Sequence, residues 1–159
     1  MKIALTLNKR EVTSAINNKY LEYVHNANMQ PICYDQRTRP EFVIDECDGL
    51  ILKGGSDLDP IYYGYDNYAS LDIDPELDDF ERKLFWGFVD VGKPVFGICR
   101  GFQLIFRELA QERTEDGRIF GFKYTQHMEG HNQTLKDVNR PYSFHYVWHN
   151  RRLYNLEDE

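Results

Sequence analysis

Cys99 stands at the centre of a Gly-x-Cys-x-Gly spacing, with Gly97 two residues before it and Gly101 two residues after it. Val95 and Phe96 favour a short buried strand just before the turn, and a helix is expected after it. The spacing is typical of a nucleophile elbow, where small residues let a strand and a helix pass closely. The helix dipole at such a turn favours a thiolate, which is the nucleophilic form. We therefore expect an acyl-transfer centre, although a lone cysteine in this position is more often a small core residue.

A second stretch with chemical potential lies about forty residues upstream, where Gly54 and Gly55 follow an apolar segment. Ligands of open parallel sheets bind at the carboxyl ends of the strands. Glycines at such an end allow backbone N–H groups to face a substrate oxygen. An isolated Gly-Gly pair is more often only a flexible turn, so this stretch gains weight only together with Cys99.

The composition excludes several classes of protein. The chain has 159 residues, enough for one domain with a real core, and its formal net charge of −7 argues against broad nucleic-acid binding. No apolar run approaches the roughly 18 residues that a membrane helix needs. Residues 1–7 are too short and too alternating for a signal peptide. Three cysteines without a motif spacing favour a reducing cytoplasm.

Strands alternate with helices along the first two thirds of the chain. The pattern predicts strands over residues 2–7, 30–34 and 48–52, and helices over 11–28 and 40–46. A further helix begins at Asp74 or Pro75 with an acidic first turn, which we expect to be a solvated helix start, and Gly92 ends it. This alternation predicts an α/β fold, a doubly wound and mainly parallel sheet with helices on both faces.

Three motifs then stand in order: residues 49–60 with Tyr63-Gly64, residues 78–84, and residues 93–104 around Cys99. They read Gly-Gly-x-Asp-x-x-Pro with a following Tyr-Gly, Asp-x-Phe-Glu, and Gly-Ile-Cys-Arg-Gly-x-Gln. Over residues 1–110 the sequence resembles the class I glutamine amidotransferase-like superfamily, and within it the γ-glutamyl hydrolase branch that includes γ-glutamyl-γ-aminobutyrate hydrolases.

This resemblance implies a flavodoxin-like fold for a single domain over residues 1–159. It implies that Cys99 attacks a γ-glutamyl amide carbonyl, and that the backbone N–H groups of Gly55 and Arg100 form the oxyanion hole. Arg100 would also help to shape the pocket. The substrate-side residues that it implies are Gly54, Ser56, Asp57, Gln103 and His127. It implies no cofactor and no metal ion. The expected partner is a small γ-glutamyl substrate, with a homo-oligomer or protein assembly left open.

The sequence departs from the branch after Leu109. A Leu-Gly-Gly turn is missing, and so is the late histidine with a following glutamate that would complete a Cys-His-Glu triad; the domain is therefore expected to be truncated at its C-terminus. His127 or His145 is a candidate replacement base. The pairs His127/His131 and His145/His149 do not predict a metal site, because the first contains a glycine and the second lies in a predicted strand.

Three functions remain in competition at this point. The first is a cysteine-dependent hydrolase of small γ-glutamyl amides that proceeds through a thioester. The second is a non-catalytic binding or assembly module that has lost the His-Glu part of the triad. The third is the glutaminase half of a synthase, which the γ-glutamyl hydrolase character of residues 57–64 makes a weaker match.

Overall fold

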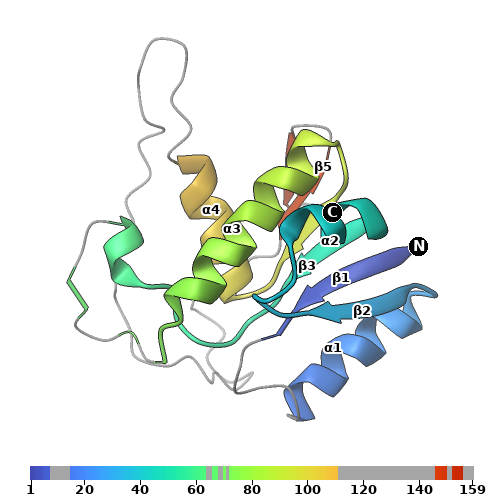
Figure 1. The fold of residues 1–159 in the computed structure, drawn as a ribbon, viewed down its shortest axis with the longest axis horizontal. Helices are drawn as coiled ribbons and strands as arrows, with labels where there is room; N and C mark the ends of the chain where they lie inside the picture. The colour runs from blue at the N-terminus through green and yellow to red at the C-terminus, as the bar shows by residue number, and fades with distance from the viewer. Residues whose placement is uncertain are drawn as a thin grey trace.

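A twisted sheet runs through the centre of the molecule (Figure 1). The computed structural model describes residues 1–7, 15–63, 66–67, 70, 72–110, 146–149 and 152–155. The sheet order is β2-β1-β3-β4-β5-β6, with β1 (Lys2–Thr6), β2 (Gln30–Tyr34), β3 (Gly49–Leu52) and β4 (Val95–Gly97). These four strands are parallel to one another, whereas β5 (Tyr146–His149) and β6 (Arg152–Asn155) continue the sheet in antiparallel pairs.

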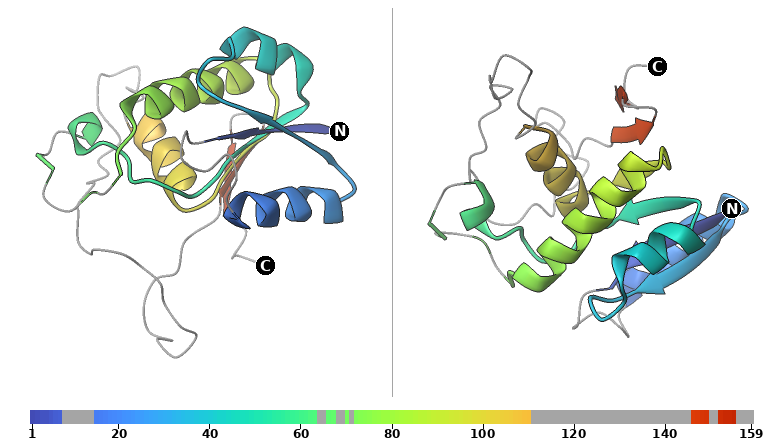
Figure 2. Two further views of the ribbon diagram at one scale, coloured as in Figure 1. Left: turned by 60° about the horizontal axis from the view of Figure 1, so that its bottom comes forward. Right: turned by 45° about the horizontal axis from the view of Figure 1, so that its top comes forward.

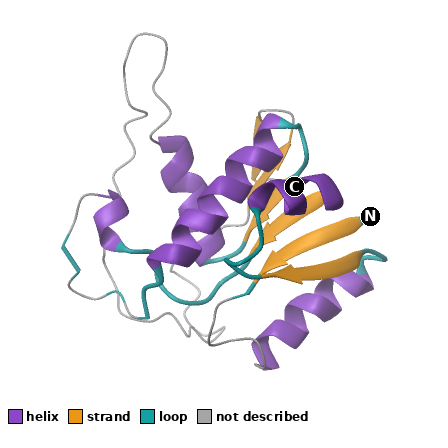
Figure 3. Ribbon diagram, viewed as in Figure 1, coloured by secondary structure: helices purple, strands orange, loops and turns teal. Residues whose placement is uncertain are grey.

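The described helices cover both faces of the sheet (Figures 2 and 3). Helix α1 (Ala15–Asn26) lies on one face, and α2 (Pro40–Glu46), α3 (Pro75–Asp90) and α4 (Arg100–Ala110) lie on the other. A short 3-10 helix, η1 (Pro60–Tyr63), interrupts the connection from β3 to α3. None of the helices in the described ranges is both long enough and apolar enough to cross a membrane.

The side-chain alternation of the strands explains the two layers. Ile3 and Leu5 of β1 pack with Val24 of α1, while Ala4 between them joins the core under α2, α3 and α4. In β3, Ile51 faces the α1 side and its two neighbours face the other side. Because successive strand residues point to opposite faces, a strand covered on both sides must be apolar throughout. This is why the near-continuous apolar run before Lys53 predicted a buried parallel strand.

The predicted elements are confirmed with small changes at their ends. Asp74 caps α3, accepting a hydrogen bond from the Leu77 N–H at 3.2 Å, and Pro75 occupies the first turn. Gly92 follows the helix with a φ of 73°, a left-handed conformation that favours glycine. The predicted first helix included residues 11–14, which lie outside the described residues, and α1 ends at Asn26, two residues earlier than predicted.

Candidate active site

Cys99 lies at the sharp turn between β4 and α4 and has a φ of 53°. A non-glycine residue in this left-handed region is strained and is held there by its surroundings. The flanking glycines explain how. A Cβ on Gly101 would lie 2.0 Å from the Leu52 carbonyl oxygen, and one on Gly97 would lie 2.7 Å from the Phe102 nitrogen. The strand and the helix therefore approach each other as the Gly-x-Cys-x-Gly spacing predicted.

The turn after β3 lies directly against the cysteine. A Cβ built on Gly54 would be 3.2 Å from the Cβ and 3.8 Å from the Sγ of Cys99. The Gly54 N–H donates a hydrogen bond to the hydroxyl of Tyr20 at 3.2 Å, so helix α1 also reaches this point. The N–H of Gly54 is therefore engaged within the protein, whereas the next residue, Gly55, is exposed.

Cys99 is half-buried, and this burial raises the pKa of its thiol. The backbone N–H of Arg100 hydrogen-bonds to the sulfur and lowers the pKa, whereas the nearby Asp57 carboxylate raises it. The sequence predicted a thiol whose pKa is lowered by the helix dipole. That prediction is wrong for this environment, because the cost of desolvating a thiolate exceeds the gain from the amide. The N–H of Arg100 is thus directed at the sulfur of Cys99.

The guanidinium of Arg100 lies inside the protein, and its charge also lowers the pKa of the Cys99 thiol. It is buried with Asp78 and Glu81 of α3, donating from Nη2 to Asp78 and from Nη1 to Glu81. Glu81 also accepts a hydrogen bond from the hydroxyl of Thr6, at the end of β1. The other carboxylate oxygen of Asp78 accepts the backbone N–H of Asp59 at 3.1 Å. The acidic start of α3 is thus only partly solvated, which corrects the sequence interpretation of Asp78.

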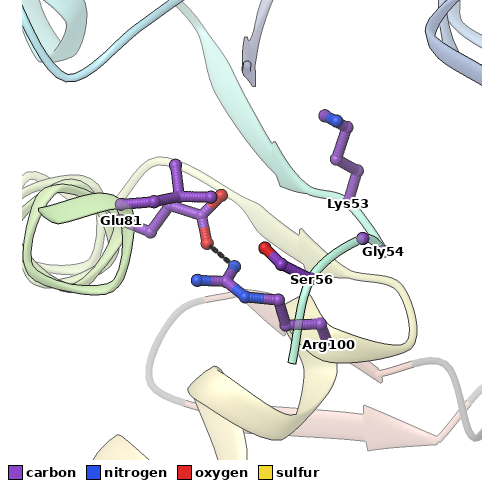
Figure 4. A pocket seen from close by; sticks show the side chains of 7 residues that line it. Lys53, Gly54, Ser56, Glu81 and Arg100 are labelled. Carbon is purple, nitrogen blue, oxygen red and sulfur yellow. Dashed lines mark hydrogen bonds and ion pairs between the residues drawn. The ribbon is translucent and has the colours of Figure 1, made fainter. Parts of the chain in front are cut away.

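A small pocket lies between this network and the turn after β3 (Figure 4). Its volume of about 10 Å³ is close to the space of one water molecule, so it is too small for a γ-glutamyl group. The Nε of Arg100, which is buried, has no hydrogen-bond partner among the described residues. The residues that line the pocket are Lys53, Gly54, Gly55, Ser56, Leu77, Glu81 and Arg100. The pocket is therefore part of the packing that holds the turn at Cys99 in place, and not a substrate site.

The structure brings most of the predicted site residues to one edge of the sheet. Gly54 touches Cys99, and Asp57 acts on the thiol electrostatically. Gly55 and Ser56 line the small pocket, and Gln103 stands on the first turn of α4, where its N–H donates to the Cys99 carbonyl oxygen at 3.1 Å. His127 and His145 lie outside the described residues.

Sequence reasoning missed two parts of this arrangement. The first is the hydrogen bond between Tyr20 and Gly54, because nothing in the sequence links the hydroxyl of Tyr20 to that glycine. Asp78 and Glu81 did carry a signal, because they are adjacent to Leu77 and Phe80 on the buried face of α3. Carboxylates that interrupt an apolar stripe require a buried partner.

Comparison with known proteins identifies the family of this chain. A sequence profile of the Peptidase C26 family matches residues 4–139. The chain belongs to the Peptidase C26 family. Its membership of the class I glutamine amidotransferase-like superfamily and its α/β, flavodoxin-like fold are thereby confirmed.

Individual relatives of this Peptidase C26 member match over shorter stretches. The "Putative glutamine amidotransferase Rv2859c" of Mycobacterium tuberculosis is 41% identical over 64 residues, which is 40% of this chain and 21% of the relative. The gamma-glutamyl-gamma-aminobutyrate hydrolase of Escherichia coli O157:H7 is 31% identical over 100 residues, 60% of this chain and 39% of the relative. The imidazole glycerol phosphate synthase subunit HisH of Prochlorococcus marinus is 36% identical over 74 residues, 46% of this chain and 30% of the subunit. The aligned part of this chain thus spans well under half the length of each of these relatives.

Proposed function

We propose that this protein hydrolyses the γ-glutamyl amide bond of a small molecule, with Cys99 as the nucleophile. The observation that carries the proposal is the half-buried thiol at a strained elbow, with the Arg100 N–H directed at its sulfur and the Gly54-Gly55 turn packed against it. Peptidase C26 membership and the likeness to a gamma-glutamyl-gamma-aminobutyrate hydrolase support hydrolase chemistry of this kind.

The reaction would proceed in two steps. In the first, the thiolate forms a bond to the γ-carbonyl carbon, the C–N bond breaks, and the amine leaves with a proton. In the second, water attacks the resulting γ-glutamyl thioester, the C–S bond breaks, and glutamate and the free thiol are released. The N–H groups of Arg100 and Gly55 would stabilise the oxyanion in both steps, and losing one such donor typically costs about a hundredfold or more in rate.

The thiol proton must pass to a base, because burial keeps the pKa of Cys99 high. We propose His127 or His145 for this role. We also propose Gly54, Ser56, Asp57 and Gln103 as substrate-side residues, with His127 on the substrate side if it is not the base. The three cysteines of the chain are free, which supports a reducing compartment, and we propose the cytoplasm.

Labelling with a glutamine-analogue diazo-ketone tests the nucleophile directly. We expect the diazo-ketone to modify Cys99 and to spare Cys33, which is exposed but lies on the edge strand β2. Iodoacetamide, which needs no substrate pocket, should modify both cysteines. Glutamate release from γ-glutamyl amides should then disappear in the Cys99→Ala variant.

The opposite pattern would contradict the proposal. If iodoacetamide modifies Cys99 but the diazo-ketone does not, the thiol is accessible without a γ-glutamyl site beside it. The non-catalytic binding module would then be the better description of the chain.

The likeness to a synthase subunit supports a second candidate, a glutaminase that works together with a partner protein. The two enzymes differ in their preferred substrate. A hydrolase should act on several γ-glutamyl amines by itself, whereas a subunit should prefer glutamine and accelerate when its partner is added.

A further inference from the structure

One carboxylate connects the two chain segments that would supply the oxyanion donors. Asp78 of α3 accepts Nη2 of Arg100 on Oδ1, and it accepts the backbone N–H of Asp59 at 3.1 Å on Oδ2. Arg100 is the residue after Cys99, and its own N–H faces the sulfur. Asp59 ends the loop that begins at Gly54 and Gly55. We call this pair of hydrogen bonds, from Arg100 and from Asp59 to the carboxylate of Asp78, the bridge. It connects the turn at Cys99, through α3, to the loop after β3.

This connection through Asp78 is buried. Asp78 and Arg100 are each only 2% exposed, so water competes little for their hydrogen bonds. Glu81 holds the other nitrogen of the guanidinium and is fixed in turn by Thr6. With both of its terminal nitrogens engaged, the Arg100 side chain cannot rotate without breaking a buried charge-assisted bond.

We propose that Asp78 is a positioning residue that sets the separation between the backbone donors of Arg100 and Gly55. This inference rests on the proposed function. Oxyanion donors act only when they lie about 2.7–3.1 Å from the developing charge. A carboxylate that holds both donor segments at once fixes this spacing before the substrate arrives, so the site needs no rearrangement during the reaction.

Asparagine at position 78 cannot reproduce the bridge. Its amide has one accepting oxygen, and its NH₂ group would face a donor either on Arg100 or on the Asp59 backbone. One of the two segments must therefore be released. Glutamate keeps the charge and lengthens the side chain by one methylene, so Asp78→Glu retains a partner for Arg100 while it changes the spacing.

Two reagents applied to Cys99 separate positioning from general reactivity. Iodoacetamide alkylates the thiolate directly, whereas the glutamine-analogue diazo-ketone presents a carbonyl to the oxyanion hole. Both require the thiolate, so a change in the pKa of Cys99 cancels in the ratio of their rates. We expect the rate of diazo-ketone labelling divided by the rate of iodoacetamide labelling to fall about tenfold or more in Asp78→Asn and in Asp78→Glu. It should stay within twofold of the wild type in Asp79→Asn.

Asp79→Asn is a matched control, because Asp79 is the next residue of α3 and loses the same charge. Its carboxylate is 40% exposed and pairs with Arg82 and Lys83 at the surface. Glu81→Gln is a second comparison, since the carboxylate of Glu81 accepts hydrogen bonds from Arg100 and Thr6, whereas the backbone N–H of Asp59 donates to Asp78. We expect its ratio to fall less than that of Asp78→Asn.

Hydrogen exchange provides a readout that does not depend on catalysis. In Asp78→Asn, peptides covering residues 53–63 and 97–104 should both exchange faster, and in Asp79→Asn neither should. An unchanged reagent ratio in both Asp78 variants would overturn the inference while the proposed function stands. If the diazo-ketone does not label wild-type Cys99, the proposed function falls and the donor-spacing role falls with it. Joint exchange of the two peptides would then support a structural bridge only.

Discussion

Gly101 leaves no room for a side chain beside the backbone of Leu52, and the Gly101→Ala substitution tests this close approach. The added Cβ would lie 2.0 Å from the Leu52 carbonyl oxygen and 2.4 Å from its carbonyl carbon. Ordinary contacts of this kind begin near 3.4 Å, so α4 and β3 must separate by more than about 1 Å. The obstacle is backbone on both sides, which cannot move away as a flexible side chain can.

Two costs contribute to the expected destabilisation. Overpacking of a close-packed core costs about 1–3 kcal/mol. The separation also stretches the hydrogen bond from the Ile98 N–H to the Leu52 oxygen, now 2.9 Å, which is worth about 1 kcal/mol. Together they amount to about 2–4 kcal/mol, which lowers the melting temperature of a domain of this size by roughly 10 °C.

Gly92→Ala is the matched control for this experiment. Gly92 has a φ of 73° but nothing within 4 Å of the position a Cβ would take. Its substitution therefore introduces only the left-handed strain of about 1–2 kcal/mol. Thermal unfolding followed by circular dichroism, with urea titration for the free energy, measures both variants. A Gly101→Ala protein as stable as Gly92→Ala would refute the close approach of β3 and α4.

Three further predictions concern the groups around the thiol. Since burial raises the pKa of Cys99, its alkylation rate by iodoacetamide should increase about tenfold per pH unit from pH 6 to 8 without a plateau; a plateau below pH 7 would contradict the raised pKa. Cys99→Gly should be about 1 kcal/mol more stable towards urea than Cys99→Ala, since glycine relieves the left-handed strain at φ 53°, and equal stabilities would argue against that strain. Tyr20→Phe should lower the free energy of unfolding by about 1–3 kcal/mol in the same assay, because the buried Gly54 N–H loses its acceptor. Tyr23→Phe, on the exposed side of α1, should leave the free energy of unfolding almost unchanged, and similar losses in both variants would count against the Tyr20 contact.

The order of the elements could be predicted from the sequence because it depends on local patterns. The near-continuous apolar run over residues 48–52, the cap at Asp74 and the glycine at position 92 each act within a few residues. The elbow was equally readable, since the spacing of Gly97, Cys99 and Gly101 reflects one local turn.

The hydrogen bonds that hold the site together could not be predicted from the sequence, because they join distant parts of the chain. Thr6 meets Glu81 across 75 positions, and Tyr20 meets Gly54 across 34. The direction of the Cys99 pKa shift was misjudged for the same reason. The dipole of α4 is a local feature, whereas the burial that raises the pKa of Cys99 comes from the packing of several elements.

The ion network of Arg100, Asp78 and Glu81 constrains how this sequence can drift. Leaving one partner of a buried ion pair uncompensated costs about 3–5 kcal/mol, a large part of the 5–15 kcal/mol that holds a typical domain together. Selection should therefore remove single replacements at these three positions, and relatives in which one of the three residues has changed should have changed the other two as well. In an alignment of relatives, the three positions should covary as a unit, independently of the acidic Asp79 beside them.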